Sequence, residues 1–273
     1  MTKLATPSTK TANDSAFDSF VKMCHLELLD GTSDETSGAV DYLKSRHLSK
    51  ASVELHKIGY CPRSAYVPDE VSTYGSELRG KDWNLSGFIK GRLVVPVMDE
   101  FGKIVGIATR TPSFEKGNTW WNSPKPFYKG NHLFMLNKAR TSTFKNNKIY
   151  IVEGYMDAFL LYQAGLKNVV GLMGTALTLR KISLVRRYCN DICLCFDVDE
   201  NDSGQKAKAK SMALLKSFEM DGNISVISDL PVGSDPADFI AKNNLDALLD
   251  MELLLSDKDI ADIIYNYEKK YVK

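Results

Sequence analysis

Strands and helices alternate regularly between residues 148 and 242, and this pattern constrains the fold more than any other feature of the chain. Apolar runs such as KIYIVEG and DICLCFD are each followed by a segment of about a dozen residues with helical apolar spacing. Parallel strands need such crossover helices, and the crossovers are right-handed. The segment therefore predicts an α/β domain with a parallel sheet flanked by helices, whose functional groups lie beyond the carboxyl ends of the strands.

Acidic residues follow three of these predicted strands. Glu153 ends the first strand, and Asp197 and Asp199 end the strand within ICLCFDVD. Asp235 and Asp238 lie in GSDPADF, just after the strand within SVISDL. Because the carboxyl ends of parallel strands meet at one edge of a sheet, we expect these side chains to converge there.

Converging carboxylates repel one another unless a cation neutralises them. Mg²⁺ prefers oxygen ligands and keeps several waters, so Mg²⁺ or Mn²⁺ is the expected cofactor. Two such ions about 4 Å apart activate an attacking hydroxyl and stabilise the leaving oxygen of a phosphoryl transfer. The alternative for any single acid in this set is that it caps the helix that follows its strand.

The net charge of +1 conceals a strongly basic middle segment. Residues 79–148 hold thirteen Lys/Arg and four Asp/Glu, a surplus of +9, whereas the residues before them sum to −3 and those after them to −5. Five aromatic residues are interleaved with these charges: Trp83, Trp120, Trp121, Phe127 and Tyr128. Basic and aromatic side chains together predict a surface for single-stranded nucleic acid, the alternative being a solvated charged face.

The chain divides into four segments by composition. Residues 1–35 are rich in Ser, Thr, Asp and Lys and predict a flexible tail. Residues 36–147 predict a mixed α+β subdomain with two short helices and a β-hairpin that turns at 99–102, where Gly102 supplies a positive φ. Residues 148–242 form the predicted metal-binding domain, and 243–273 predict C-terminal helices.

The composition indicates a cytoplasmic protein. The N-terminus MTKLATPSTKTANDS has no apolar block, and no apolar run approaches the roughly 18 residues of a membrane span, so no membrane partner is expected. The five cysteines show no C-x-x-C spacing, so we expect reduced structural thiols and no zinc.

Six motifs resemble those of a known family. VEGYMD, FDVD and SDPADF are similar to the three motifs of the Toprim fold, which bacterial DnaG-type primases share with topoisomerases and some nucleases. AVDYLKSRHLSKASVELHKIGYCP, GRLVVPVMDEFGKIVGIATR and WNSPKPFYKGNHLFML resemble, in that order, the N-terminal subdomain of the primase RNA-polymerase core. A topoisomerase or nuclease would share the acids but not the hairpin or the NSP segment, so the resemblance, over residues 38–242, is to primases.

The resemblance implies roles for the acidic residues. Glu153 would be a metal ligand or general base. Asp197, Asp199 and Asp235 would bind the catalytic divalent ions, with Asp238 as a further ligand.

The resemblance also implies roles for a glycine and for four residues of the basic segment. Gly154 would allow close approach of the backbone at a strand-to-helix turn. The residues that would contact template and incoming nucleotide are Arg92, Arg110, Asn122 and Lys129. The alternatives are a salt bridge at a strand end for Arg110 and an Asx turn before Pro124 for Asn122.

The implied activity is that of a DNA primase catalytic core, which joins ribonucleoside triphosphates on a single-stranded DNA template. A replicative helicase or a separate zinc-bearing subunit are candidate partners. Two rival functions use the same sequence features: a Toprim nuclease that uses the acids to admit water, and a catalytically degenerate module that binds single-stranded DNA in replication.

The sequence departs from the family pattern at four places. Val198 stands where the second motif often has Gly, so the metal-binding loop is expected to be reshaped. Ala237 stands where the third motif commonly has a second Asp, so one metal site is expected to be weakened or shifted. Thr119, Trp120 and Trp121 replace an expected lysine, so stacking is expected to replace part of the charge there. No zinc ribbon precedes the core and no full-size helicase-binding domain follows it, which suggests an excised core, a compact phage or mobile-element primase, or one partner of a split system.

Overall fold

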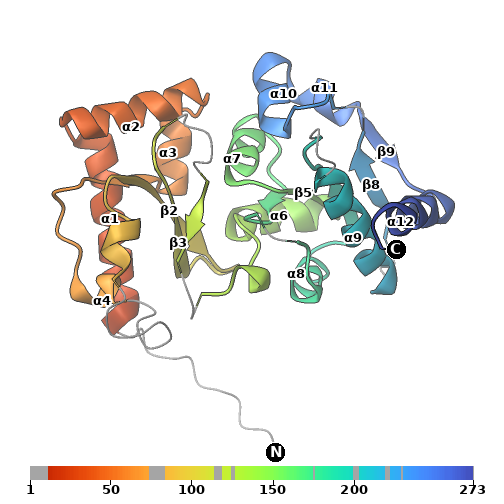
Figure 1. The fold of residues 1–273 in the computed structure, drawn as a ribbon, viewed down its shortest axis with the longest axis horizontal. Coiled ribbons are helices and arrows are strands. Elements are labelled where there is room, and N and C mark those ends of the chain that lie inside the picture. Colours follow the sequence, from red (N-terminus) through yellow and green to blue (C-terminus); the bar gives the residue numbers. More distant parts are fainter. Residues whose placement is uncertain are drawn as a thin grey trace, which may run out of the picture. The chain divides into compact units, whose positions relative to one another are not determined.

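A computed structural model describes most of the chain. The described residues are 12–73, 84–113, 119–123, 127–174, 176–198, 203–218, 222–228 and 230–272. They belong to two compact units, the first comprising Met1–Val97 with Ile104–Phe127 and the second Met98–Lys103 with Tyr128–Lys273 (Figure 1). Among the described residues, no helix is long and apolar enough to cross a membrane.

The first unit begins with three helices and a short strand. These are α1 (Ala12–Asp30), α2 (Asp34–Ser45), α3 (Lys50–His56) and β1 (Gly59–Cys61). Ser33 and Ser49 cap α2 and α3, since their hydroxyls each accept a backbone N–H three residues ahead at 3.2 Å. The two short helices that lead into a strand are therefore confirmed.

Helix α1 lies where a flexible tail was expected, so that prediction is wrong from Ala12 onward. Phe17, Phe20, Val21 and Cys24 recur three and four residues apart and are all buried. This apolar stripe packs against β1 and against α4 (Asp69–Ser72), and its burial outweighs the polar composition of the segment.

A four-stranded antiparallel sheet completes the first unit, in the order β1-β2-β3-β4. The other strands are β2 (Arg92–Met98), β3 (Ile104–Arg110) and β4 (Trp121–Asn122), and the 3₁₀ helix η1 (Leu85–Phe88) precedes β2. The hairpin turn is confirmed: Gly102 has φ +92°, and Asp99 Oδ1 accepts the backbone N–H groups of Phe101 and Lys103 at 2.9 and 3.0 Å.

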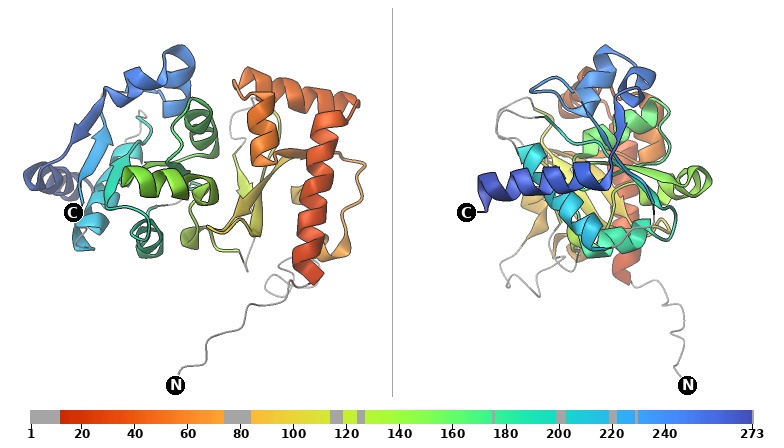
Figure 2. Two further views of the ribbon diagram at one scale, coloured as in Figure 1. Left: turned by 180° about the vertical axis from the view of Figure 1, so that it is seen from behind. Right: turned by 90° about the vertical axis from the view of Figure 1, so that its right-hand side faces the viewer.

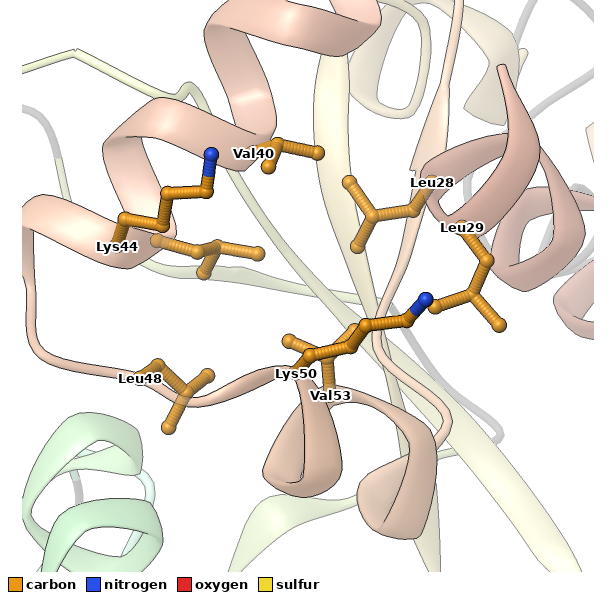
Figure 3. Close-up of a pocket in the computed structure, with 8 residues that line it drawn as sticks. Leu28, Leu29, Val40, Lys44, Leu48, Lys50 and Val53 are labelled. Carbon is orange, nitrogen blue, oxygen red and sulfur yellow. The ribbon is translucent and has the colours of Figure 1, made fainter.

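An apolar hollow of about 270 Å³ lies among the three helices of the first unit (Figure 3). Its lining residues are Leu28, Leu29, Val40, Leu43, Lys44, Leu48, Lys50 and Val53. Lys44 and Lys50 place their aliphatic stems along the hollow, as long charged side chains commonly do at apolar surfaces.

The second unit is built on a five-stranded sheet in the order β6-β5-β7-β8-β9. Its strands are β5 (Lys148–Val152), β6 (Val169–Gly171), β7 (Asp191–Leu194), β8 (Ile224–Ile227) and β9 (Glu252–Leu254). Its helices are η2 (Lys129–Asn131), α6 (Leu136–Asn146), α7 (Tyr155–Gln163), α8 (Leu179–Val185), α9 (Ser203–Ser217), α10 (Pro236–Lys242), α11 (Leu245–Leu249) and α12 (Asp257–Tyr271). The expected sheet flanked by helices is confirmed, with β5 to β8 parallel.

The order of the strands places a switch point between β5 and β7. The chain moves from β5 outward to β6, then returns past β5 to β7 and continues to β8. Right-handed crossovers therefore put α7 on one face and α8 and α9 on the other, where α12 packs beside α9 (Figure 2). In sheets of this kind the ligand crevice lies at the carboxyl ends of the two strands that flank the switch point.

The segment 243–273 contains a strand in addition to the expected helices. β9 pairs antiparallel with β8 and closes an edge that would otherwise be open. The Glu252 carboxylate anchors it by accepting hydrogen bonds from Lys148 Nζ, Ser225 Oγ and, at 2.8 Å, the hydroxyl of Tyr150. The prediction of helices alone was wrong here because these partners lie far away in sequence.

Candidate active site

Two of the predicted acids meet at the switch point of the second unit. Glu153 directly follows β5, and Asp197 follows β7, its hydrogen-bonded neighbour, in which Leu194 pairs with Ile151. The backbone N–H of Asp197 donates to Glu153 Oε1 at 3.3 Å. The sheet register therefore brings together two acids that are 44 residues apart.

A third acid, Asp157, was not predicted as a site residue and lies beneath this pair. It is 5% exposed, and its two carboxylate oxygens accept the backbone N–H groups of Gly154, at 3.1 Å, and Ala237, at 3.3 Å. Burial and, after it, the negative charges of Asp235 and Asp197 together raise the pKa of Asp157 to about 8, against the opposing effect of the two N–H donors. Asp157 therefore lies within the electrostatic field of Asp235 and Asp197, and Glu153 adjoins Asp197.

Gly154 is required for space rather than for an unusual backbone conformation. It is the N-cap of α7 with φ −105°, which other residues adopt readily. A Cβ at this position would lie 2.5 Å from Asp157 Oδ2, closer than atoms can approach. The close approach expected at this turn is thus between the Gly154 backbone and the carboxylate of Asp157.

Asp235 caps α10. Its Oδ1 accepts the backbone N–H of Asp238 at 2.6 Å, and Pro236 occupies the first helical position. The capping alternative is therefore correct for one oxygen of Asp235 in this structure. Asp238 lies in the first turn of the same helix, and Ala237 between them is fully buried.

Backbone bonds join the segment after β7 to the segment after β8. Val198 and Ser234 form an isolated antiparallel bridge, and Gly233 N–H donates to Val198 O at 2.6 Å. At the start of α9, a Cβ on Gly204 would lie only 1.9 Å from the backbone oxygen of Asp197. These contacts hold Asp197 and Asp235 at one edge, while Asp199 lies outside the described residues.

The residues at this edge fit a hard divalent cation by the chemistry of their donors. Glu153, Asp157, Asp197 and Asp235 supply only oxygen atoms, and the charges of Asp235 and Asp197 add to burial in raising the pKa of Asp157. Within the part of the chain that the structure describes, no three Asp, Glu, His or Cys side chains form a group able to hold a metal ion. The predicted ligand set includes Asp199, which that part does not contain.

Lys129 lies in η2 of the second unit, near a buried lysine that the sequence did not single out. Lys181 on α8 is fully buried, and its Nζ donates to Leu172 O at 3.0 Å. Burial and, after it, the charge of Lys129 together lower the pKa of Lys181 to about 7. Thr178 caps α8 and donates its hydroxyl to Gly130 O at 2.7 Å, which fixes the turn that carries Lys129.

Arg92, Arg110 and Asn122 lie in the first unit. Arg92, at the start of β2, donates hydrogen bonds to Thr109 Oγ1 in β3 and to Thr111 Oγ1 just after it, each at 3.0 Å. Burial lowers the pKa of Arg92, and the charge of Arg110 lowers it further. Asn122 lies in β4, whereas Pro124, on which its alternative Asx turn depended, is outside the described residues.

The salt bridge proposed as an alternative for Arg110 does not form among the described residues. Arg110 Nε donates instead to the hydroxyl of Tyr42, at 2.9 Å. Both guanidinium groups therefore keep their positive charge uncompensated by any carboxylate of the described chain.

Comparisons with known proteins match both halves of the chain. Residues 27–140 match the family model of the DNA primase catalytic core, N-terminal domain, and residues 150–240 match a Toprim-like model. The DNA primase of Rickettsia typhi is 32% identical over 241 residues, which cover 81% of this chain and 40% of that protein. The DNA primase of Synechococcus elongatus is 30% identical over 232 residues, which cover 77% of this chain and 33% of that protein.

Solved structures share the fold. A DNA primase domain from Pseudomonas aeruginosa has a TM-score of 0.77 at 22% identity and covers 93% of this chain and 83% of its own. A DnaG primase catalytic domain bound to ssDNA has a TM-score of 0.74 at 22% identity and covers 93% of this chain and 84% of its own. The chain described above spans only 33% and 40% of the length of the two full primases it matches.

Proposed function

Because the chain carries the DnaG-type primase catalytic core, an N-terminal core domain followed by a Toprim domain, we propose that it synthesises short RNA primers on single-stranded DNA. Its substrates would be ribonucleoside triphosphates, and it would act in the cytoplasm. A replicative helicase or a separate zinc-bearing subunit would be its protein partners.

The observation that carries this proposal is the meeting of acids at the switch point. The backbone N–H of Asp197 donates to the Glu153 carboxylate, and the charges of Asp235 and Asp197 add to burial in raising the pKa of Asp157. Such repulsion costs folding free energy unless a cation occupies the site, so the arrangement is better suited to metal-assisted phosphoryl transfer than to structural support.

The acids would hold the divalent ions, with Asp197, Asp199 and Asp235 as the main ligands and Asp238 and Glu153 beside them. Bound Mg²⁺ or Mn²⁺ would supply charge neutralisation at the phosphoryl oxygens. In the reaction, the 3′-oxygen of the growing strand bonds to the α-phosphorus, and the bond to the β-phosphate bridging oxygen breaks to release pyrophosphate. Glu153 is the candidate acceptor for the hydroxyl proton.

The basic residues would hold the two polyanionic substrates. Arg92, Arg110, Asn122 and Lys129 present donors that suit phosphate oxygens, and contacts to phosphate carry little sequence information. Binding of single-stranded DNA should therefore weaken steeply as salt is added.

The test is an incubation of the purified chain with single-stranded template, labelled ribonucleotides and Mg²⁺ or Mn²⁺. Short RNA that requires template and nucleotides is the expected result. Divalent-dependent shortening of labelled DNA without nucleotides would instead identify a Toprim nuclease, and DNA binding without either product would identify a degenerate DNA-binding module.

A further inference from the structure

Two of the five cysteines, Cys24 and Cys61, meet in the core of the first unit although they are far apart in sequence. Cys24 lies in α1 and Cys61 ends β1, and both are fully buried in the same apolar cluster. Both are free thiols, and the S–H of Cys24 donates a hydrogen bond to Cys61 Sγ. The two sulfur atoms are therefore direct neighbours.

The backbone of β1 approaches α1 closely at Gly59. A Cβ on Gly59 would lie 2.7 Å from Cys24 Cβ, and His25 Nδ1 donates to Ile58 O at 2.7 Å. Residues two apart in a strand point to the same face, so Cys61 faces α1 as Gly59 does. The contact between the two thiols thus follows from the packing of this helix on this strand.

The two thiols differ in acidity. The hydrogen bond from Cys24 lowers the pKa of Cys61, and the charge of Lys90 also lowers it, against the opposing effects of burial and of Glu27. The same hydrogen bond, together with burial, raises the pKa of Cys24. Since the thiolate is the form that reacts with oxidants, Cys61 would react first, with Cys24 beside it as the second thiol.

The apolar hollow gives a small solute a route towards this pair. Leu28 lines the hollow and lies one helical turn from Cys24 on the same face of α1 (Figure 3). The hollow has a volume of about 270 Å³. One water needs only roughly 10–15 Å³, and hydrogen peroxide is a molecule of similar size. An oxidant of this size can therefore approach the pair from the hollow.

We propose that Cys24 and Cys61 are an oxidation site, at which hydrogen peroxide closes a disulfide between α1 and β1. The Cys61 thiolate attacks one peroxide oxygen, the O–O bond breaks and hydroxide leaves, so that Cys61 becomes a sulfenic acid. The sulfur of Cys24 then bonds to that of Cys61, the S–O bond breaks, and the oxygen leaves as water with the proton of Cys24. In total the two thiols lose two electrons and two protons, and the peroxide becomes two waters.

The disulfide would act on the sheet that carries a predicted substrate-binding residue. β1 is an edge strand, in which Cys61 pairs with Arg92 of β2. The crosslink would therefore tie α1 to the strand beside Arg92. The inference does not depend on the proposed function, because it concerns only the chemistry of the two thiols.

The test exposes the folded, full-length chain to hydrogen peroxide and maps the products after the peroxide is removed. Thiols titrated in the unfolded wild type should fall from five to three, since two are consumed, and dithiothreitol should restore them. Digestion without reductant should give one crosslinked pair of peptides, which contains residues 24 and 61 and lacks two hydrogen atoms. A non-reducing gel should show the band of a single chain.

Three variants separate the roles of the two thiols. Cys24→Ser keeps a hydrogen-bond donor beside Cys61, and it should leave Cys61 as a sulfenic acid that dimedone labels, with no crosslink. Cys61→Ser should give neither the label nor the crosslink. Cys189→Ser, which replaces a buried cysteine of the second unit, should form the crosslink like the wild type.

Four results would overturn the proposal. They are the retention of all five thiols, a disulfide between other cysteines, a crosslink between two chains, and further oxidation of Cys61 without a bond to Cys24. Each is read from the wild type alone, so the decision stands even where a variant fails to fold. No readout uses nucleotides or DNA, so a chain that makes no RNA would refute the proposed function and leave this inference standing.

Discussion

The buried Lys181 should make the stability of the second unit depend on pH between neutral and alkaline conditions. Its side chain is fully buried, and burial together with the charge of Lys129 lowers its pKa to about 7 from the ordinary 10.5. Between these two pKa values the unfolded chain binds a proton at Lys181 that the folded chain does not bind, so the free energy of unfolding rises with pH. This increase in the free energy of unfolding is complete above the pKa of the unfolded chain, and it is lost as the pH falls towards 7.

The size of the effect follows from the two pKa values. Between pH 7 and pH 9.5 the difference in proton binding integrates to about 3 kcal/mol, as an upper estimate for one group. Lys181→Met removes the titrating group and keeps much of the side-chain volume. It also removes the donor to Leu172 O, a loss of roughly 1–3 kcal/mol that does not depend on pH.

Urea titrations of the wild type and Lys181→Met at pH 7 and pH 9.5 measure this effect. The difference in unfolding free energy between the two proteins should shift by up to about 3 kcal/mol in favour of the wild type at the higher pH. Lys145→Met, which replaces an exposed lysine on α6, should show no such shift. An equal difference at both pH values would refute the assignment of a neutral buried lysine.

Three further predictions concern the site and the sheet that carries it. Asp197→Ala should abolish primer synthesis in the template assay while leaving the urea midpoint nearly unchanged, and retained synthesis would contradict its role. Gly204→Ala should displace the start of α9, because its Cβ would lie 1.9 Å from Asp197 O, and should lower the synthesis rate at least tenfold in the same assay; normal activity would show that the approach is not needed. Glu252→Gln should destabilise the protein by roughly 1–3 kcal/mol in urea, because the ion pair with Lys148 is lost, and an unchanged midpoint would show that β9 does not depend on this anchor.

The parallel sheet could be predicted because its signals are local. Each strand is a short apolar run followed by a helix with regular apolar spacing, and right-handed crossovers leave few ways to arrange them. The acids could be placed at one edge for the same reason, since Glu153 and Asp197 follow adjacent strands. The β-hairpin could be predicted for the same reason, because Gly102 marks its turn between two β-rich runs.

The features that sequence reasoning missed depend on partners distant in sequence. Strand β9 is held by Glu252 contacts to Lys148 and Tyr150, 104 and 102 residues away. Asp157 owes its raised pKa first to its burial and then to the charges of Asp235 and Asp197, which no local pattern around it reveals. A signal was present, however, because Asp157 follows Gly154 by three residues at a helix start, the spacing of a capping box.

Binding of Mn²⁺ to the purified chain is the decisive measurement, because the proposed chemistry requires Glu153, Asp197 and Asp235 to act together on divalent ions. Electron paramagnetic resonance measures free Mn²⁺ during a titration of the wild type, Asp197→Ala and Asp235→Ala. We expect the wild type to bind Mn²⁺ and each substitution to weaken binding at least tenfold. Equal Mn²⁺ binding by all three proteins, or none by the wild type, would contradict this expectation.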